Sequence, residues 1–268
     1  MNREYLIQQI KEKKSYLCVG LDTDFEKIPD HLKGFPDAIF KFNKQIIDST
    51  KDLCVAYKIN TAFYEALGVK GWEALEKTVA YIPSTHFKIA DAKRGDIGNT
   101  SNQYAKAFFE TIPFDAITVA PYMGRDSIKP FLDYQNKWTI VLGLTSNEGS
   151  KDFQQQRLHG KFLYEEVIRK TAEWGTENNL MFVIGATKVE EIFSIREKIP
   201  NHFLLIPGVG FQGGNLAEVS KYGLNKDCGL LVNVSRAIIY AGKGRKFAEE
   251  ARAIALDYQT KMKYYLDF

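Results

Sequence analysis

Eight short apolar segments are spaced along the whole chain, and longer amphipathic stretches separate most of them. The segments cover residues 16–21, 55–59, 86–90, 116–120, 138–144, 180–185, 203–206 and 229–234. Each is rich in Val, Ile, Leu or aromatic residues and almost continuously apolar, which is typical of parallel strands buried on both faces. This alternation constrains the fold most strongly, because it favours a parallel sheet covered by helices.

Helical patterns occupy most of the intervals between these segments. They cover residues 37–50, 71–81, 99–110, 160–178, 188–198 and 246–258. Eight strands in a chain of 268 residues favour an α/β fold of the (β/α)8 (TIM) barrel type, which runs about 250 residues as one unit. No Pro/Ser-rich linker or change in composition divides the chain, so we expect a single domain over residues 1–268.

Composition excludes several classes of protein. A hydrophobic fraction of 45% excludes a disordered chain, and a net charge of +3 gives no support for a nucleic-acid partner. The longest apolar runs fall far short of the roughly 20 residues of a membrane helix. The polar N-terminus does not resemble a signal peptide, and Cys18, Cys54 and Cys228 form no CxxC pair. We therefore expect a cytoplasmic protein with buried, reduced thiols and no membrane partner.

Polar residues collect where the predicted strands end. They are Asp22, Lys58, Asp91, Lys93, residues 145–147, residues 207–210, Ser235 and Arg236. In barrel enzymes the reactive groups lie at the carboxyl ends of the strands and in the loops that follow. This one-sided collection therefore predicts an active site at that end of the barrel.

The densest cluster is the sequence DAKRGD at residues 91–96. Side chains two apart on a strand point the same way, so we expect Asp91 and Lys93 to face the barrel lumen together. Buried opposite charges are costly unless they pair, and pairing shifts both pKa values. Asp96 lies beyond the strand, where Gly95 lets the backbone turn. Taken alone, the cluster also fits a structural ion pair at a strand end.

Lys58 favours a functional site over that structural interpretation. It lies inside an apolar strand, where a lysine is rarely buried unless it is paired and otherwise extends its ammonium group to water. The neighbouring strand supplies two carboxylates, Asp91 and Asp96, that are able to hold it. We expect the two lysines and the two aspartates to alternate in one charged cluster of nearly zero net charge. Lys58 and Lys93 would repel Mg²⁺ from those carboxylates, and the four histidines lack metal-ligand spacing.

A glycine-rich loop follows the seventh predicted strand at residues 207–214, PGVGFQGG. It matches GxGxxG by letter, but the next strand ends in Ser235 and Arg236 and not in the acidic residue of a dinucleotide site. Loops after strands seven and eight form the usual phosphate site of barrel enzymes, and an arginine can bind phosphate with two hydrogen bonds. We expect a phosphate monoester here; a purely structural glycine turn is the alternative.

Residues 91–100, DAKRGDIGNT, closely resemble the signature of the orotidine 5′-phosphate decarboxylase family, whose core is D-x-K-x-x-D. The form DAKRGDIG is similar to the longer bacterial branch of that family. Further matching segments are residues 19–22, Lys58 with residues 63–65, residues 144–147, residues 207–214 and residues 233–236. The core motif is shared with barrels that act on sugar-phosphate keto acids, whereas all these segments in order are much more specific.

The resemblance implies a homodimeric barrel that converts orotidine 5′-monophosphate to UMP and CO₂ without a metal or organic cofactor. It implies that Lys93 donates a proton to C6 of the pyrimidine, that Asp91 faces the departing CO₂, and that Lys58 bonds Asp91 and the ribose. It also implies that Asp96 and Thr100 cross the dimer interface to the partner's ribose. The substrate-binding residues that it implies are Asp22 for a ribose hydroxyl, Ser146 for the pyrimidine amide, Gln212, Ser235 and Arg236 for the phosphate, and Pro207.

Two alternatives remain open. A Mg²⁺-dependent decarboxylase or aldolase of the same superfamily resembles the chain at D-x-K-x-x-D but has a metal-binding acid where Lys58 stands. A non-catalytic nucleotide-phosphate-binding barrel would keep Arg236 and the glycine loop, yet it has no need for a buried Lys93 between two aspartates. The expected chemistry agrees with the family, because a carbanion at C6 has no adjacent carbonyl and needs electrostatic stabilisation.

Overall fold

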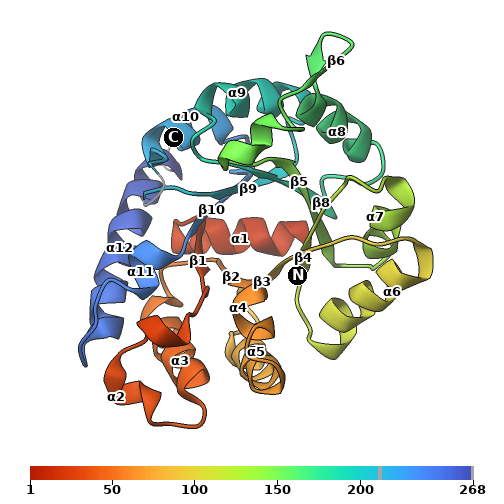
Figure 1. Ribbon diagram of the computed structural model, residues 1–268. Coiled ribbons are helices and arrows are strands. Elements are labelled where there is room, and N and C mark those ends of the chain that lie inside the picture. The colour runs from red at the N-terminus through yellow and green to blue at the C-terminus, as the bar shows by residue number, and fades with distance from the viewer. Residues whose placement is uncertain (211–212, 267–268) are drawn as a thin grey trace.

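Eight parallel strands form a closed barrel in the computed structural model, which describes residues 1–210 and 213–266 (Figure 1). The barrel strands are β1 (Leu17–Gly20), β2 (Ala56–Asn60), β3 (Phe87–Arg94), β4 (Ala116–Val119), β5 (Trp138–Leu144), β8 (Leu180–Ile184), β9 (Phe203–Pro207) and β10 (Leu230–Val234). Each pairs with the next barrel strand, and β10 pairs with β1 to close the ring. The predicted single-domain TIM barrel is confirmed.

The apolar character of the strands follows from burial on both faces. Every residue of β1, β4, β8 and β10 is buried, because one face lines the packed lumen and the other lies under the helices. Trp138, at the start of β5, contacts Phe87 of β3 and Phe203 of β9 edge to face. The end of the barrel at which the strands begin is therefore a filled core. This leaves the end at which the strands finish for a site.

Helices surround the barrel, and six of them correspond to predicted patterns. These are α3 (Ala38–Thr50), α5 (Val69–Tyr81), α6 (Gly98–Lys106), α8 (Leu163–Ala172), α9 (Val189–Lys198) and α12 (Phe247–Leu266). The sequence did not predict α1 (Arg3–Lys13), α2 (Asp30–Lys33), α4 (Ala62–Glu65), α7 (Arg125–Leu132), α10 (Leu216–Gly223) and α11 (Arg236–Ile239). Within the described ranges, no helix combines the length and the apolar character that a membrane crossing requires.

Three predicted helices differ from the structure at their ends: the one expected at 246–258 continues to Leu266, and the one expected at 160–178 ends at Ala172. The helix expected at 99–110 ends at Lys106 and continues as a π-helical turn, Ala107–Thr111. The helix expected at 160–178 begins only at Leu163, because a small hairpin, β6 (Arg157–Leu158) and β7 (Lys161–Phe162), precedes it. The turn residues His159 and Gly160 have φ values of 51° and 82°, as a two-residue hairpin turn requires. The hairpin projects from the body of the protein (Figure 1).

Helix α1 lies across the end of the barrel at which the strands begin (Figure 1). The guanidinium group of Arg3 donates to the backbone carbonyl groups of Glu177 and Asn201 at 2.7 and 2.8 Å. These two residues precede β8 and β9. Since α1 closes this end, the open end is the one at which the strands finish.

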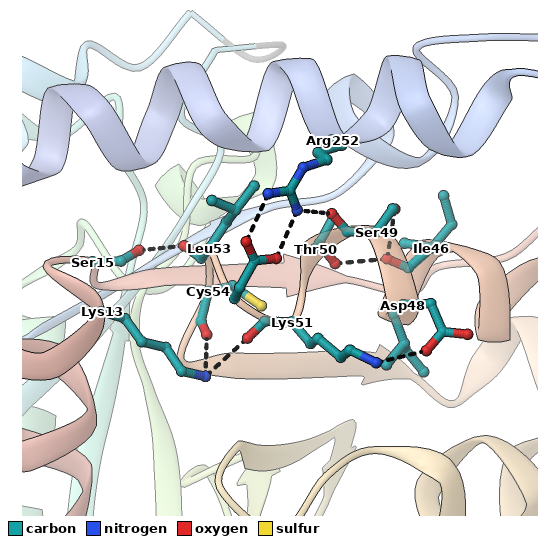
Figure 2. Close-up of polar contacts among 12 residues, drawn as sticks. Lys13, Ser15, Ile46, Asp48, Ser49, Thr50, Lys51, Leu53, Cys54 and Arg252 are labelled. Carbon is teal, nitrogen blue, oxygen red and sulfur yellow. Dashed lines mark hydrogen bonds and ion pairs between the residues drawn. The ribbon is translucent and has the colours of Figure 1, made fainter.

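The loop that leads into β2 is fixed at the closed end (Figure 2). Nζ of Lys13, the last residue of α1, donates to the backbone carbonyl groups of Lys51 at 3.0 Å and Cys54 at 2.9 Å. Arg252 of α12 pairs with both carboxylate oxygens of Asp52 at 2.6 and 2.7 Å. These contacts hold the start of β2, the strand that carries Lys58.

Candidate active site

Lys58 lies between two carboxylates at the open end of the barrel. Its buried ammonium group donates to Oδ2 of Asp91 at 2.9 Å and to Oδ1 of Asp22 at 3.3 Å. Asp22 follows β1 and Asp91 lies in β3, and β2 pairs with both of these strands. Lys58 is thus buried and paired, but its second partner is Asp22 and not Asp96. The strand order explains the difference, because β1 pairs with β2 on the side opposite β3.

The electrostatics of this group keep its members charged. Burial alone would lower the pKa of Lys58, but the charges of Asp22 and Asp91 outweigh burial and hold that pKa above its ordinary value. Burial would likewise raise the pKa of Asp91, but Lys58 and Lys93 hold it well below its usual range. Lys58 and Asp91 are therefore both ionised near neutral pH. Pairing opposite charges in this way is what makes their burial tolerable.

Lys93 reaches Asp91 from a bulge near the end of β3. The strands β3 and β4 pair regularly up to Ala90 and again from Arg94, and between these positions three residues of β3 face Thr118 alone. The backbone of Lys93 is left-handed, with φ of 48°. Its ammonium group donates to Oδ1 of Asp91 at 2.6 Å. The expected pairing is present, but an irregular backbone produces it and not the regular alternation of a strand.

The expectation that Lys93 is buried between two aspartates is wrong. Its side chain is 48% exposed, and Asp91 is the aspartate that it contacts. Asp96 turns elsewhere: its Oδ1 accepts a hydrogen bond from the N–H group of Ile97 at 2.7 Å, ahead of α6. The chain leaves the barrel at Gly95, where a β-carbon would lie 3.1 Å from the carbonyl oxygen of Ala120. This exit carries Asp96 away from the lumen of its own chain.

Thr118 is a site residue that sequence reasoning missed. It is fully buried in β4. Its Oγ1 accepts a hydrogen bond from the backbone N–H group of Lys93 at 2.9 Å and donates one to Oδ1 of Asp91 at 3.1 Å. In the sequence it is one threonine in an apolar strand, and only the pairing of β3 with β4 brings it to the two charged residues. No local motif carried this signal.

Arg94 fixes the same segment from the outer side of the barrel. Its guanidinium group pairs with Glu65 of α4 and donates to the backbone carbonyl group of Ala92 at 3.0 Å. It also lies 5.4 Å from the ring centres of Tyr104 and Phe108, an arrangement that favours a cation over an aromatic face. The residue that follows Lys93 is therefore held independently of the contacts inside the barrel.

A cavity of about 160 Å³ opens beside the charged group. The residues that line it are Asp22, Lys58, Asp91, residues 207–209 and residues 233–237. Pro207 ends β9, and Ser235 and Arg236 follow β10. The charged residues and the predicted phosphate segments therefore surround one cavity. Lys93 joins them through its contact with Asp91.

Two close backbone approaches shape the phosphate side of the cavity. A β-carbon at Gly20 would lie 2.6 Å from Cβ of Ser235, so glycine lets β1 meet the start of α11, and Oγ of Ser235 donates to the Gly20 carbonyl group at 3.2 Å. After β9, Gly208 and Gly210 have φ values of 97° and 82°, which glycine adopts without strain. The predicted phosphate ligand Gln212 lies outside the described residues.

Ser146 and Thr100, also predicted as substrate ligands, do not line this cavity. Ser146 follows β5 and packs against Gly185, where a β-carbon would lie 2.8 Å from Cβ of Ser146. Thr100 is exposed on α6, the helix that Asp96 precedes. The structure thus gathers most of the predicted site at one cavity and leaves Asp96, Thr100 and Ser146 around it.

The position between Asp22 and Asp91 is taken by the ammonium group of Lys58. The metal-dependent alternative needs an acidic ligand where this lysine stands. Across residues 1–210 and 213–266, no three His, Cys, Asp or Glu side chains lie close enough together to hold a metal ion. The described donor groups therefore do not form a metal centre of the ordinary type.

Comparisons with known proteins extend over almost the whole chain. The model of the orotidine 5′-phosphate decarboxylase / HUMPS family matches residues 15–251. A protein of Parabacteroides distasonis named orotidine 5′-phosphate decarboxylase is 58% identical over 270 residues, which cover 99% of this chain and 96% of that protein. One of the same name from Bacteroides fragilis is 57% identical over 266 residues, 98% of this chain and 97% of that protein. The structure of Leishmania donovani OMP decarboxylase matches with a TM-score of 0.82 and 35% identity, over 97% of this chain and 99% of that one.

Proposed function

The chain belongs to the orotidine 5′-phosphate decarboxylase / HUMPS family, and on this basis we propose how its residues carry out the family's reaction. The chain is an enzyme that decarboxylates orotidine 5′-monophosphate to UMP in pyrimidine biosynthesis. The observation that carries the mechanism is the 2.6 Å contact of the Lys93 ammonium group with Asp91 beside the cavity.

Lys93 is the group that meets the negative charge of the reaction. Loss of CO₂ leaves an electron pair at C6 of the pyrimidine, in an orbital that no neighbouring carbonyl group can delocalise. A fixed cation beside C6 lowers the energy of that charge more in the transition state than in the bound substrate, which is the condition for catalysis. Lys93 then donates a proton to C6. Its exposed side chain supports this role, because a bound substrate is able to cover it.

Asp91 and Lys58 set the position of Lys93. Asp91 accepts hydrogen bonds from Lys58, Lys93 and Thr118, and its lowered pKa keeps it ionised. We place the carboxylate of the substrate beside Asp91, where it becomes neutral CO₂ as the reaction proceeds. Lys58 holds Asp91 and bonds the ribose, and Asp22 accepts from a ribose hydroxyl group.

The rest of the cavity binds the remote end of the substrate. We assign the phosphate to Gln212, Ser235 and Arg236, with Pro207 lining the path between phosphate and ring. Ser146 contacts the pyrimidine amide from the loop after β5. Binding energy from the phosphate, far from C6, is available to hold the reacting carboxylate against Asp91. The support is the common cavity that the loops after β9 and β10 share with Lys58 and Asp91.

We further propose that the enzyme is a homodimer in which Asp96 and Thr100 reach the partner's ribose. Both residues lie beyond the cavity of their own chain. Large apolar side chains are exposed on the neighbouring segments: Ile97, next to Asp96, is 59% exposed, and Tyr122, which follows the adjacent strand β4, is 88% exposed. Exposed apolar patches of this kind mark interaction surfaces. A second copy of the chain covers them in this proposal.

The cytoplasm is the compartment that we propose for the reaction. Cys18, Cys54 and Cys228 are all free and buried. Proteins of reducing compartments typically carry their cysteines in this form, whereas secreted domains pair them.

The decisive experiment follows the loss of orotidine 5′-monophosphate absorbance on addition of the purified protein. The wild-type chain is expected to consume the substrate and form UMP. Lys93→Ala is expected to abolish turnover while UMP still binds, because the phosphate and ribose contacts remain. Lys88→Ala, which removes another lysine of β3 at the opposite end of the strand, serves as the matched control and keeps activity. Full activity of Lys93→Ala would overturn the mechanism.

A further inference from the structure

We propose that Thr118 is a positioning residue for the decarboxylation: its hydroxyl group sets the backbone turn that brings the Lys93 ammonium group onto Asp91. This inference rests on the proposed roles of Lys93 and Asp91. Thr118 itself is fully buried and does not line the cavity. It therefore acts through its two neighbours and not by touching substrate.

The backbone at Lys93 needs a specific restraint. A left-handed conformation, φ of 48° here, is unfavourable for a residue with a side chain, because its Cβ approaches the carbonyl oxygen. Such strain persists when surrounding contacts over-determine it, and it concentrates at functional sites. The bulge also removes the regular β3–β4 ladder from this point. The backbone N–H group of Lys93 must therefore find its partner elsewhere, and that partner is Oγ1 of Thr118.

The hydroxyl group of Thr118 accepts one hydrogen bond and donates the other, and chemistry fixes which is which. A hydroxyl group has one proton to donate and lone pairs to accept. The N–H group of Lys93 can only donate, at 2.9 Å, so the hydroxyl proton is available for Oδ1 of Asp91 at 3.1 Å. That same Oδ1 accepts from the Lys93 ammonium group at 2.6 Å. Backbone, hydroxyl, carboxylate and ammonium group thus form a small closed ring of contacts.

Removing the hydroxyl group breaks this ring at two points. The Lys93 N–H group loses its partner inside the barrel, and Asp91 loses one of its donors. Arg94 still holds the following residue through Glu65 and the carbonyl group of Ala92, so the strand end stays in place. The expected change is a local one: the Lys93 ammonium group no longer has one fixed position beside C6.

The test compares three variants. Thr118→Val replaces the hydroxyl group by a methyl group of similar size, and Thr118→Ser keeps the hydroxyl group. Thr139→Val on the adjacent strand β5 is the matched control: Thr139 is also fully buried, and among the residues that the structure describes its hydroxyl group makes no hydrogen bond. Steady-state kcat and KM, the affinity for UMP and the thermal unfolding midpoint are measured for each.

We expect Thr118→Val to lower kcat about 100-fold, the scale on which a small misplacement of a catalytic group acts. KM and UMP affinity should stay within about twofold of wild type, since the phosphate and ribose contacts are intact, and Thr118→Ser should restore most of kcat. Thr139→Val should leave kcat unchanged. If valine at 118 prevents folding, Thr118→Ala removes the same hydroxyl group without adding bulk.

Three outcomes separate this inference from the proposed function. Wild-type kcat in Thr118→Val, in a protein whose Lys93→Ala variant is inactive, overturns the role of Thr118 and leaves the mechanism standing. A lower unfolding midpoint with unchanged kcat also overturns it, because Thr118 would then be structural only. Activity that survives Lys93→Ala overturns the proposed mechanism itself.

Discussion

The ammonium group of Lys93 lies 2.6 Å from a carboxylate oxygen of Asp91, and Ala92 alone separates the two residues along β3. In a regular strand, positions two apart are separated by roughly 6.6 Å, and a lysine that extends from such a position points straight off the sheet. The left-handed backbone at Lys93 turns its side chain back onto Asp91. The two charges therefore form an ion pair beside the cavity that Asp91 and Lys58 line.

Chelation should leave the activity unchanged. Lys58 occupies the position between Asp22 and Asp91, so a divalent cation there would meet an ammonium group at close range. The measurement is the turnover of orotidine 5′-monophosphate after exhaustive dialysis against EDTA, with and without added Mg²⁺. Activity that disappears and returns with Mg²⁺ would instead assign the chain to the metal-dependent alternative.

Arg236→Ala should lower kcat/KM about 10- to 150-fold. A hydrogen bond to a charged group contributes about 1.5–3 kcal/mol, and each 1.36 kcal/mol is tenfold in rate. Arg236 lines the cavity on the side of the predicted phosphate. Stopped assays on wild type and variant give the ratio directly.

Two controls isolate the phosphate contact of Arg236. Arg245→Ala removes another exposed arginine, between α11 and α12, and should leave kcat/KM unchanged. The nucleoside that lacks the phosphate should be turned over equally poorly by wild type and Arg236→Ala. A further loss on the nucleoside would mean that Arg236 supports the ring or the fold.

The barrel could be predicted from the sequence because each strand carries its own signal. Parallel strands buried on both faces are nearly continuous apolar runs, and all eight stand out. Helix α1 escaped prediction for the opposite reason. It buries Leu6 and Ile10 but also Arg3 and Gln9, since it packs across loop ends that accept hydrogen bonds, and its sequence is mostly polar. Its amphipathic pattern is accordingly weak.

The sequence could predict only those site residues whose residue type and immediate neighbours are themselves unusual. A lysine inside an apolar strand indicates a buried charge with partners, and Lys58 has them. The identity of its second partner depends on the pairing of β1 with β2, which sets Asp22 beside it, and the contact of Thr118 depends on the β3–β4 register. Both are properties of strand pairing over long sequence separations, and no local pattern encodes them.

Acid should destabilise the fold through His86. Burial and the nearby charge of Lys13 lower the pKa of His86 from 6.5 to about 4, and its Nε2 lies 2.8 Å from Nζ of Lys13. The folded state thus favours neutral His86, so this stabilisation is fully present above pH 6.5 and is lost as the pH falls to about 4. The loss should be on the order of 3 kcal/mol.

Urea unfolding at several pH values between 4 and 7 measures this effect. His86→Gln should flatten the dependence of the unfolding free energy on pH in that range. Part of the slope should remain, because burial also lowers the pKa of His202 to about 4. His159→Gln, at the exposed hairpin turn, is the matched control and should keep the wild-type slope. An unchanged slope in His86→Gln would contradict this account.

Complementation between two inactive variants tests the shared site. Lys93→Ala and Asp96→Ala homodimers should each be nearly inactive, because every site in them lacks one group. A heterodimer has one site that lacks both groups and one that takes Lys93 from one chain and Asp96 from the other. Random pairing of equal amounts makes about half of the dimers mixed, each with one intact site of two, so about a quarter of wild-type activity should return.

The kinetics of recovery decide between a shared site and a site within one chain. Activity should appear only as subunits exchange, at the rate at which native mass spectrometry detects heterodimers. A mixture of Lys93→Ala with the double variant Lys93→Ala/Asp96→Ala should stay inactive under the same exchange, because no chain in it supplies Lys93. The exit of the backbone at Gly95 and the exposure of Ile97 and Tyr122 both favour recovery. Heterodimers that form without activity would place Asp96 in the site of its own chain.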